Sequence, residues 1–104
     1  MKMLAHAEDE DDLYLFELII EELGDYGYDE PSAIVLMDAY YEIFTGSLYS
    51  KANDLTPLTM DFYRHQGYHC MANRIYFHIV LGKPPGEEKF VKWYNKIMKD
   101  RRGF

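Results

Sequence analysis

Carboxylate pairs in the first half of the chain are the first residues whose spacing suggests chemistry. Glu17 and Glu21 stand four residues apart, and so do Asp38 and Glu42. Side chains four apart share one face of an α-helix, and carboxylates on facing helices offer the hard oxygen ligands that Mg²⁺ and Mn²⁺ prefer. The same residues also fit the solvent-facing sides of two amphipathic helices, because unpaired charged side chains are rarely buried.

These carboxylates give about 26 residues of the chain a resemblance to a known family. The segments Glu17-Leu-Ile-Ile-Glu21-Glu22 and Asp38-Ala-Tyr-Tyr-Glu42 resemble the EExxE and ExxD helices of MazG-type all-α NTP pyrophosphohydrolases, although their order and spacing differ. The resemblance implies a metal-dependent hydrolase that uses the carboxylates of two helices. We keep this function as an alternative, since no Lys or Arg stands near these residues in the sequence to bind a triphosphate.

A second candidate constellation is the series Asp61, His65 and His69, with His78 further along the chain. Two histidines four apart on one helix can bind Zn²⁺ when a third ligand comes from elsewhere. The glutamate that a zinc protease carries between its histidines is missing here. A half-buried, hydrogen-bonded role is the more common one for a histidine on an apolar stripe, so we assign no metal ligand and leave zinc binding open.

Acidic and tyrosine residues interleave in the segments DYGYDE and DAYYE, after the acidic run Glu8–Asp12. Carboxylates spaced along helices can imitate nucleic-acid phosphates, which recur at a few Å, and tyrosines supply anchors for a protein contact. Small phage-encoded inhibitors of restriction or CRISPR effectors are similar in size, charge and helical content. The predicted partner-binding residues are Glu17, Glu21, Glu22, Asp25, Tyr26, Tyr28, Asp29, Asp38, Tyr40, Tyr41 and Glu42.

Charge is divided along the chain beneath the formal net charge of −7. Residues 1–46 contain thirteen Asp or Glu against Lys2 alone, whereas residues 47–104 contain ten Lys or Arg against five acids. The basic residues of the last helix could contact phosphates, or they could solubilise the helix and favour its dipole. They are Lys89, Lys92, Lys96, Lys99, Arg101 and Arg102. Because the acidic half would repel nucleic acid, direct nucleic-acid binding remains an alternative.

The leading prediction is a small, acidic, non-enzymatic binding protein. Its acidic, tyrosine-rich face would dock on a basic, nucleic-acid-handling protein partner, in the manner of a phage-type inhibitor. We assign no catalytic residue, no cofactor and no metal, and a homo-oligomer is compatible with these features.

The elements that must position these residues are predicted to be helices. Apolar spacing indicates helices at about 10–23, 31–45 and 87–99, and a longer helical pattern from Thr56-Pro57 to Leu81 that Gly67 interrupts. Residues 74–81 could alternatively be a strand, and residues 1–8 are expected to be a flexible N-terminus. The apolar residues predicted to be buried are Leu13, Phe16, Ile20, Met37, Phe44, Phe62, Ile75, Ile79, Phe90 and Ile97.

Length and composition indicate one all-α domain of four or five helices. A chain of 104 residues, 48% apolar and 28% charged, has room for a single core. Its one cysteine, Cys70, cannot form an intrachain disulfide and is expected to be a buried, inert thiol. The chain shows neither a signal-peptide pattern nor an apolar stretch near the roughly 18 residues of a membrane span, so we expect a cytoplasmic protein.

Overall fold

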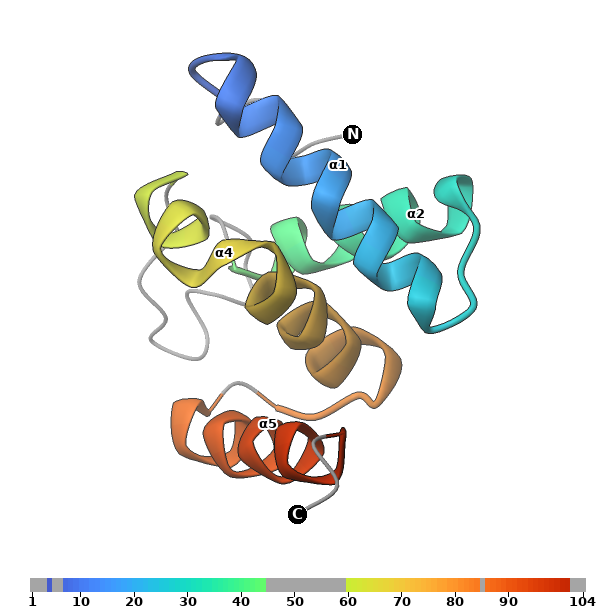
Figure 1. Ribbon diagram of the computed structural model, residues 1–104, viewed down its shortest axis with the longest axis vertical. Helices are drawn as coiled ribbons and strands as arrows, with labels where there is room; N and C mark the ends of the chain where they lie inside the picture. Colours follow the sequence, from blue (N-terminus) through green and yellow to red (C-terminus); the bar gives the residue numbers. More distant parts are fainter. Residues whose placement is uncertain (1–3, 5–6, 45–59, 85, 102–104) are drawn as a thin grey trace.

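The computed structural model of the protein describes residue 4 and residues 7–44, 60–84 and 86–101 (Figure 1). Its elements are α1 (Glu10–Asp25), α2 (Glu30–Phe44), α4 (Met60–Ile75), the short π-helix η2 (Tyr76–Val80) and α5 (Glu87–Arg101). These described residues contain no strand, which confirms the predicted all-α class and the helical alternative for residues 74–81. The predicted start at Thr56-Pro57 lies outside the described residues, as do Arg102 and most of the predicted N-terminal segment.

Side-chain caps fix the starts of the first two helices. The Asp9 carboxylate accepts the backbone N–H of Asp12 at 3.1 Å, and the Asp29 carboxylate accepts that of Ser32 at 3.0 Å. Such caps satisfy backbone donors that have no partner within the helix. We expected α1 to end before Gly24, but it continues to Asp25, and the glycine with positive φ in the turn after it is Gly27, at 100°.

The core lies where α1 and α2 pack against α4. Its largest fully buried side chains include Phe16 on α1, Tyr40 on α2 and Tyr63 on α4. The rings of Phe16 and Tyr63 meet edge to face, with centroids 6.4 Å apart. The buried residues that form this core cluster are Phe16, Ile19, Leu23, Ala33, Met37, Tyr40, Phe44, Met60, Tyr63, Met71, Ala72 and Ile75.

Of the apolar residues that we predicted to be buried, one is exposed and several are only half-buried. Leu13 is 43% exposed, because α1 turns Asp12, Phe16, Ile19 and Leu23 inward instead. Burial is confirmed for Phe16, Met37, Phe44, Ile75 and Phe90, whereas Ile20, Phe62, Ile79 and Ile97 are half-buried.

Gly67 divides α4 into two segments with different buried faces. Its φ of 77° and ψ of 167° are far from helical values. Met60 and Tyr63 are buried before the kink, and every residue of the segment 71–75 is buried after it. The kink agrees with the interruption that the sequence indicated at Gly67. The expected place of His65 on an apolar stripe was wrong, because His65 is exposed.

Helix α5 packs against the end of α4 and η2, so that α4 lies between α1 and α5 in the view of Figure 1. Phe90 is buried, and its ring meets that of Phe77 edge to face, with centroids 5.6 Å apart. The guanidinium carbon of Arg74 lies 4.3 Å from the centroid of Phe90. In the part of the chain that the structure describes, no helix is both long and apolar enough to cross a membrane.

Candidate partner-binding surface

The outward side of α1 is a continuous row that we call the acidic face, formed by Glu10, Tyr14, Glu17, Glu21 and Asp25. All five residues are exposed, and Tyr14 is 60% exposed. Their steps of four, three, four and four place them on one side of the helix, opposite the buried positions of α1. Among the described residues, none of these four carboxylates has an ion-pair partner. The face is therefore uncompensated negative charge around one aromatic ring.

Other acids of the N-terminal half are neutralised within the fold. Asp12 is buried and accepts two hydrogen bonds from the Arg64 guanidinium, at 2.9 and 2.8 Å. The same guanidinium reaches Asp61 at 2.9 Å and Glu8 at 3.2 Å. Hydrogen bonds from Arg64 and from the backbone N–H of Glu8 lower the pKa of Asp12 to about 2. The bonds from Arg64 to Asp12 and Glu8 stabilise the packing of α1 on α4, whereas the pair with Asp61 lies within α4.

Glu22 also has a structural partner, unlike its neighbour Glu21. Its carboxylate lies 3.1 Å from Nδ1 of His69, and the other ring nitrogen of His69 lies 3.2 Å from the sulfur of Met98. The histidine therefore joins α1, α4 and α5. Of the predicted contact residues, Glu22 is thus part of this internal network.

Two shallow pockets flank the acidic face. One of about 250 Å³ is lined by Glu17, Ile20, Glu21 and Glu30, from α1 and α2. The other, of about 220 Å³, is lined by Leu18, Glu21, Glu22, Asp25 and Tyr68, from α1 and α4. Glu21 lines both pockets, so it stands on the ridge between them. The carboxylates are spread along a ridge, which suits a docking surface better than a reaction centre.

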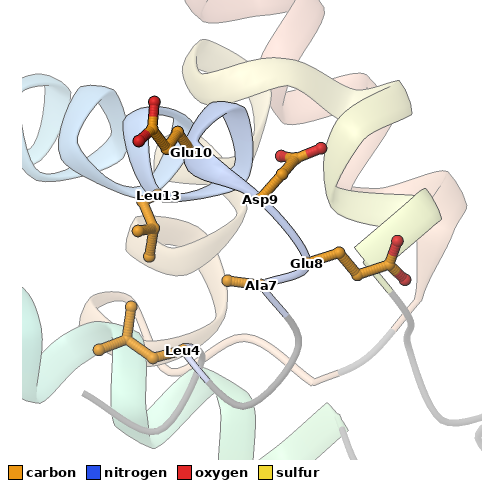
Figure 2. Close-up of a pocket in the computed structure, with 6 residues that line it drawn as sticks. All are labelled: Leu4, Ala7, Glu8, Asp9, Glu10 and Leu13. Carbon is orange, nitrogen blue, oxygen red and sulfur yellow. The ribbon is translucent and has the colours of Figure 1, made fainter.

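A third hollow, of about 380 Å³, lies beside the start of α1. Figure 2 shows Leu4, Ala7 and Leu13 facing this hollow, whereas the carboxylates of Asp9 and Glu10 point away from it. Leu4 and Leu13 are 45% and 43% exposed. An apolar patch therefore adjoins the N-terminal end of the acidic face.

The tyrosines that the sequence nominated as anchors are mostly engaged elsewhere. Tyr40 is 1% exposed, so it belongs to the core and not to a contact surface. The Tyr26 hydroxyl donates to the Asn73 side chain, and the Tyr26 ring stacks on Tyr76 with centroids 4.0 Å apart. Tyr28 and Tyr41 are half-buried.

Among the described residues, the exposed tyrosines are Tyr14 and Tyr68, and our sequence prediction missed both. Tyr14 is 60% exposed and Tyr68 41%. A signal for Tyr14 was present, because it stands four residues after Glu10 and three before Glu17. No such signal existed for Tyr68, which reaches the surface next to α1 through the kink at Gly67.

The α2 acids contribute less to one surface than predicted. Asp29 caps α2, Asp38 is half-buried and Glu42 is exposed. The hydrolase alternative required Asp38 and Glu42 to converge with Glu17 and Glu21. Neither of them lines the pocket that Glu17 and Glu21 share with Glu30.

The described residues also offer no metal centre at the histidines. His65 and His69 lie on opposite sides of the Gly67 kink, which breaks the helical spacing that would align them. No three His, Cys, Asp or Glu side chains among the described residues are arranged so that they could hold a metal ion.

Cys70 and Arg74 share one polar partner beneath α5. The Cys70 thiol donates to Oε1 of Gln66 at 3.0 Å, and Arg74 Nε donates to the same oxygen at 3.0 Å. Cys70 is half-buried, where we expected it to be buried, and burial raises the pKa of its thiol. All three residues belong to α4, and the same Arg74 guanidinium joins α4 to α5 through its ion pair with Glu87.

No protein-family model, curated protein or solved structure matches this chain. Function therefore has to be inferred from the surfaces described above.

Proposed function

We propose that this protein is a small binding protein that docks the acidic face of α1 on a basic surface of a nucleic-acid-handling partner. The observation that supports this most directly is the row of Glu10, Glu17, Glu21 and Asp25 around Tyr14. These carboxylates are exposed and have no ion-pair partner among the described residues. A basic partner would supply the missing counter-charge.

The position of these acids along α1 supports a role outside folding. Acids in a first helical turn, such as Glu10, interact favourably with the helix dipole, but acids near the last turn interact unfavourably. Asp25 ends α1, and no basic residue stands in that last turn. Glu17, Glu21 and Asp25 also repel one another at a spacing of four residues. Their charge costs helix stability, which a contact with a basic partner would offset.

Nucleic-acid mimicry follows from the spacing of the charges. Glu17, Glu21 and Asp25 follow one another at steps of four residues, so the Cβ atoms of successive members lie about 5–6 Å apart. This is of the same order as the few Å between successive phosphates of duplex DNA. Tyr14 and Tyr68 provide apolar bodies with polar tips for the centre of such a contact. A phage-type inhibitor of a nucleic-acid enzyme would need this combination.

The experiment compares the wild-type protein with the neutralised variant Glu17→Gln/Glu21→Gln/Asp25→Asn. Both proteins are immobilised and exposed to a bacterial lysate, and proteins captured by the wild type alone are identified by mass spectrometry. Each captured protein is then purified, and its association rate is measured at increasing salt and with duplex DNA as a competitor. Mimicry predicts a rate that falls steeply above about 0.1 M salt and competition by DNA.

Two further variants separate the acidic face from the rest of the surface. Tyr14→Ala should raise the dissociation rate about 30-fold, which corresponds to the roughly 2 kcal/mol of a hot spot. Lys92→Gln/Lys96→Gln on α5 is the control, and at nanomolar protein concentrations it should leave both rates unchanged. A partner that binds the neutralised variant equally well, or that DNA does not displace, would contradict the proposal.

A further inference from the structure

The outward side of α5 is the counterpart of the acidic face within the same chain. Lys89, Lys92, Lys96 and Lys99 are all exposed, and steps of three, four and three place them on one side of the helix. We call this row the lysine face. Lys92 lies 3.4 Å from Glu88, in a pair whose side chains are both mostly exposed, and the other three lysines have no ion-pair partner among the described residues.

The two faces do not neutralise each other inside one molecule. In the view of Figure 1, α4 lies between α1 and α5. None of the ion pairs among the described residues joins a carboxylate of α1 or α2 to a lysine of α5. Both rows therefore keep their charge at the surface of an isolated copy, where a second copy can reach them.

We propose that the lysine face of one copy docks on the acidic face of another copy. Charge complementarity identifies the occupant of the acidic face as a second copy. At a rise of about 1.5 Å per residue, the acidic face extends about 22 Å from Glu10 to Asp25, and the lysine face extends about 15 Å from Lys89 to Lys99. The whole lysine face therefore fits along the acidic face. Successive carboxylates of the acidic face are seven, four and four residues apart, and successive lysines are three, four and three residues apart. Both rows thus carry charge along one side of a helix, and several lysines can meet carboxylates at once. The aliphatic stems of the lysines can also cover the exposed ring of Tyr14.

The geometry of this contact determines what it assembles. Because the two faces are different surfaces, the contact is heterologous, and it propagates from copy to copy unless a rotation closes a ring. A pair of helices of this length buries less than the roughly 1,600 Å² of a standard stable interface. Self-association should therefore be weak and sensitive to both concentration and salt. It does not rest on the proposed function, although a basic partner would compete for the same face.

Charge reversal in two matched variants tests the inference. The variant Glu17→Lys/Glu21→Lys loses the net negative charge of the acidic face and keeps the lysine face. The variant Lys92→Glu/Lys96→Glu loses the net positive charge of the lysine face and keeps the acidic face. Each should remain monomeric alone, and an equimolar mixture should associate again because each supplies the face that the other lacks. Both variants stay net negative, since two reversals change the formal net charge of −7 by four. Recovery in the mixture therefore cannot come from opposite net charges.

A third variant controls for net charge. Glu88→Lys/Asp100→Lys changes the net charge as much as Glu17→Lys/Glu21→Lys does, but it keeps the acidic face and adds lysines to α5. It should associate at least as well as the wild type. Circular dichroism and thermal unfolding check that all variants remain folded, as expected for exposed substitutions.

The measurement is the weight-average mass by sedimentation equilibrium of the purified protein alone. For the wild type it should rise between about 10 μM and 1 mM protein, and the association constant should fall on the order of tenfold between about 50 and 500 mM salt. A monomer at every concentration in low salt would overturn the proposal. So would association that survives either reversal, or a mixture that stays monomeric. No foreign partner takes part, so these outcomes are independent of the proposed function.

Discussion

The buried carboxylate of Asp12 on α1 accepts two hydrogen bonds from the guanidinium of Arg64 on α4, at 2.9 Å from Nε and 2.8 Å from Nη2. The backbone N–H of Glu8 donates to the same carboxylate at 2.8 Å. These bonds satisfy a charge that would otherwise be costly to bury. They also turn the Asp12 side of α1 toward the core, which leaves Leu13 at the surface.

Because of this ion pair, the free energy of unfolding should depend on pH in the acidic range. The pKa of Asp12 falls from 3.8 to about 2 in the folded protein, chiefly because of the Arg64 hydrogen bonds. The ionised Asp12 carboxylate therefore contributes fully to the free energy of unfolding above 3.8, its pKa in the unfolded chain. This contribution is lost as the pH falls toward 2. Urea unfolding between pH 5 and about pH 2 should show this loss. Asp12→Asn should be less stable at pH 5 and should lose less stability over that range.

Arg74 and Glu87 form the second cross-helix pair, between α4 and α5. The Arg74 side chain is 7% exposed and donates two hydrogen bonds to Glu87, at 2.9 and 2.6 Å. Glu87→Gln should lower the free energy of unfolding by about 2 kcal/mol, because a buried guanidinium loses its charged acceptor. Glu88→Gln is the control and should cost less than about 0.5 kcal/mol. If chemical denaturation gave the same loss of unfolding free energy for both variants, the Arg74–Glu87 pair would not stabilise the packing of α5 on α4.

The register of α1 can be checked with two alanine substitutions. Phe16 is 1% exposed and Leu13 43%. Phe16→Ala should cost about 3–5 kcal/mol, since it removes a ring from the core, whereas Leu13→Ala should cost less than about 1 kcal/mol. Urea denaturation measures both. A larger loss for Leu13→Ala would restore the register that the sequence first indicated.

Two glycines should respond to alanine in opposite directions. Gly67 has φ 77° and ψ 167°, a conformation that is nearly exclusive to glycine, so Gly67→Ala should cost about 1–3 kcal/mol through backbone strain. Gly24 lies in α1, and an added Cβ meets nothing within 4 Å. Gly24→Ala should therefore stabilise the protein by about 0.5–1 kcal/mol. For a chain of this size each kcal/mol shifts the melting temperature by about 4–8 °C, which calorimetry resolves.

Local patterns predicted the helices but not how they are rotated. Residues 13–20 are apolar at so many positions that several inward faces of α1 are compatible with them. The choice among these faces depends on the contact of Asp12 with Arg64, 52 residues away in sequence. The same limit applies to α2, where Tyr40 and Tyr41 are adjacent and the fold buries Tyr40.

The candidate surface was partly predictable for a related reason. Acids at helical spacing, such as Glu17 and Glu21, were found because charge and period are local properties. Glu22 could not be separated from Glu21, since its partner His69 comes from another helix. Tyr68 was missed because its position depends on the Gly67 kink, and the sequence indicated only a weak point in the helix there.

The acidic face should show its cost to folding when its charges are removed one at a time. Glu10 stands in the first turn of α1 and Asp25 ends the helix, so neutralisation should shift stability in opposite directions. Glu10→Gln should lower the free energy of unfolding, and Asp25→Asn should raise it, each by about 0.3–1 kcal/mol at low salt. The difference should shrink in about 1 M salt, where the Debye length is about 3 Å. Chemical denaturation at both salt concentrations measures the two shifts. If Asp25→Asn were destabilising, Asp25 would contribute to folding, and its position at the end of α1 would no longer support a binding role.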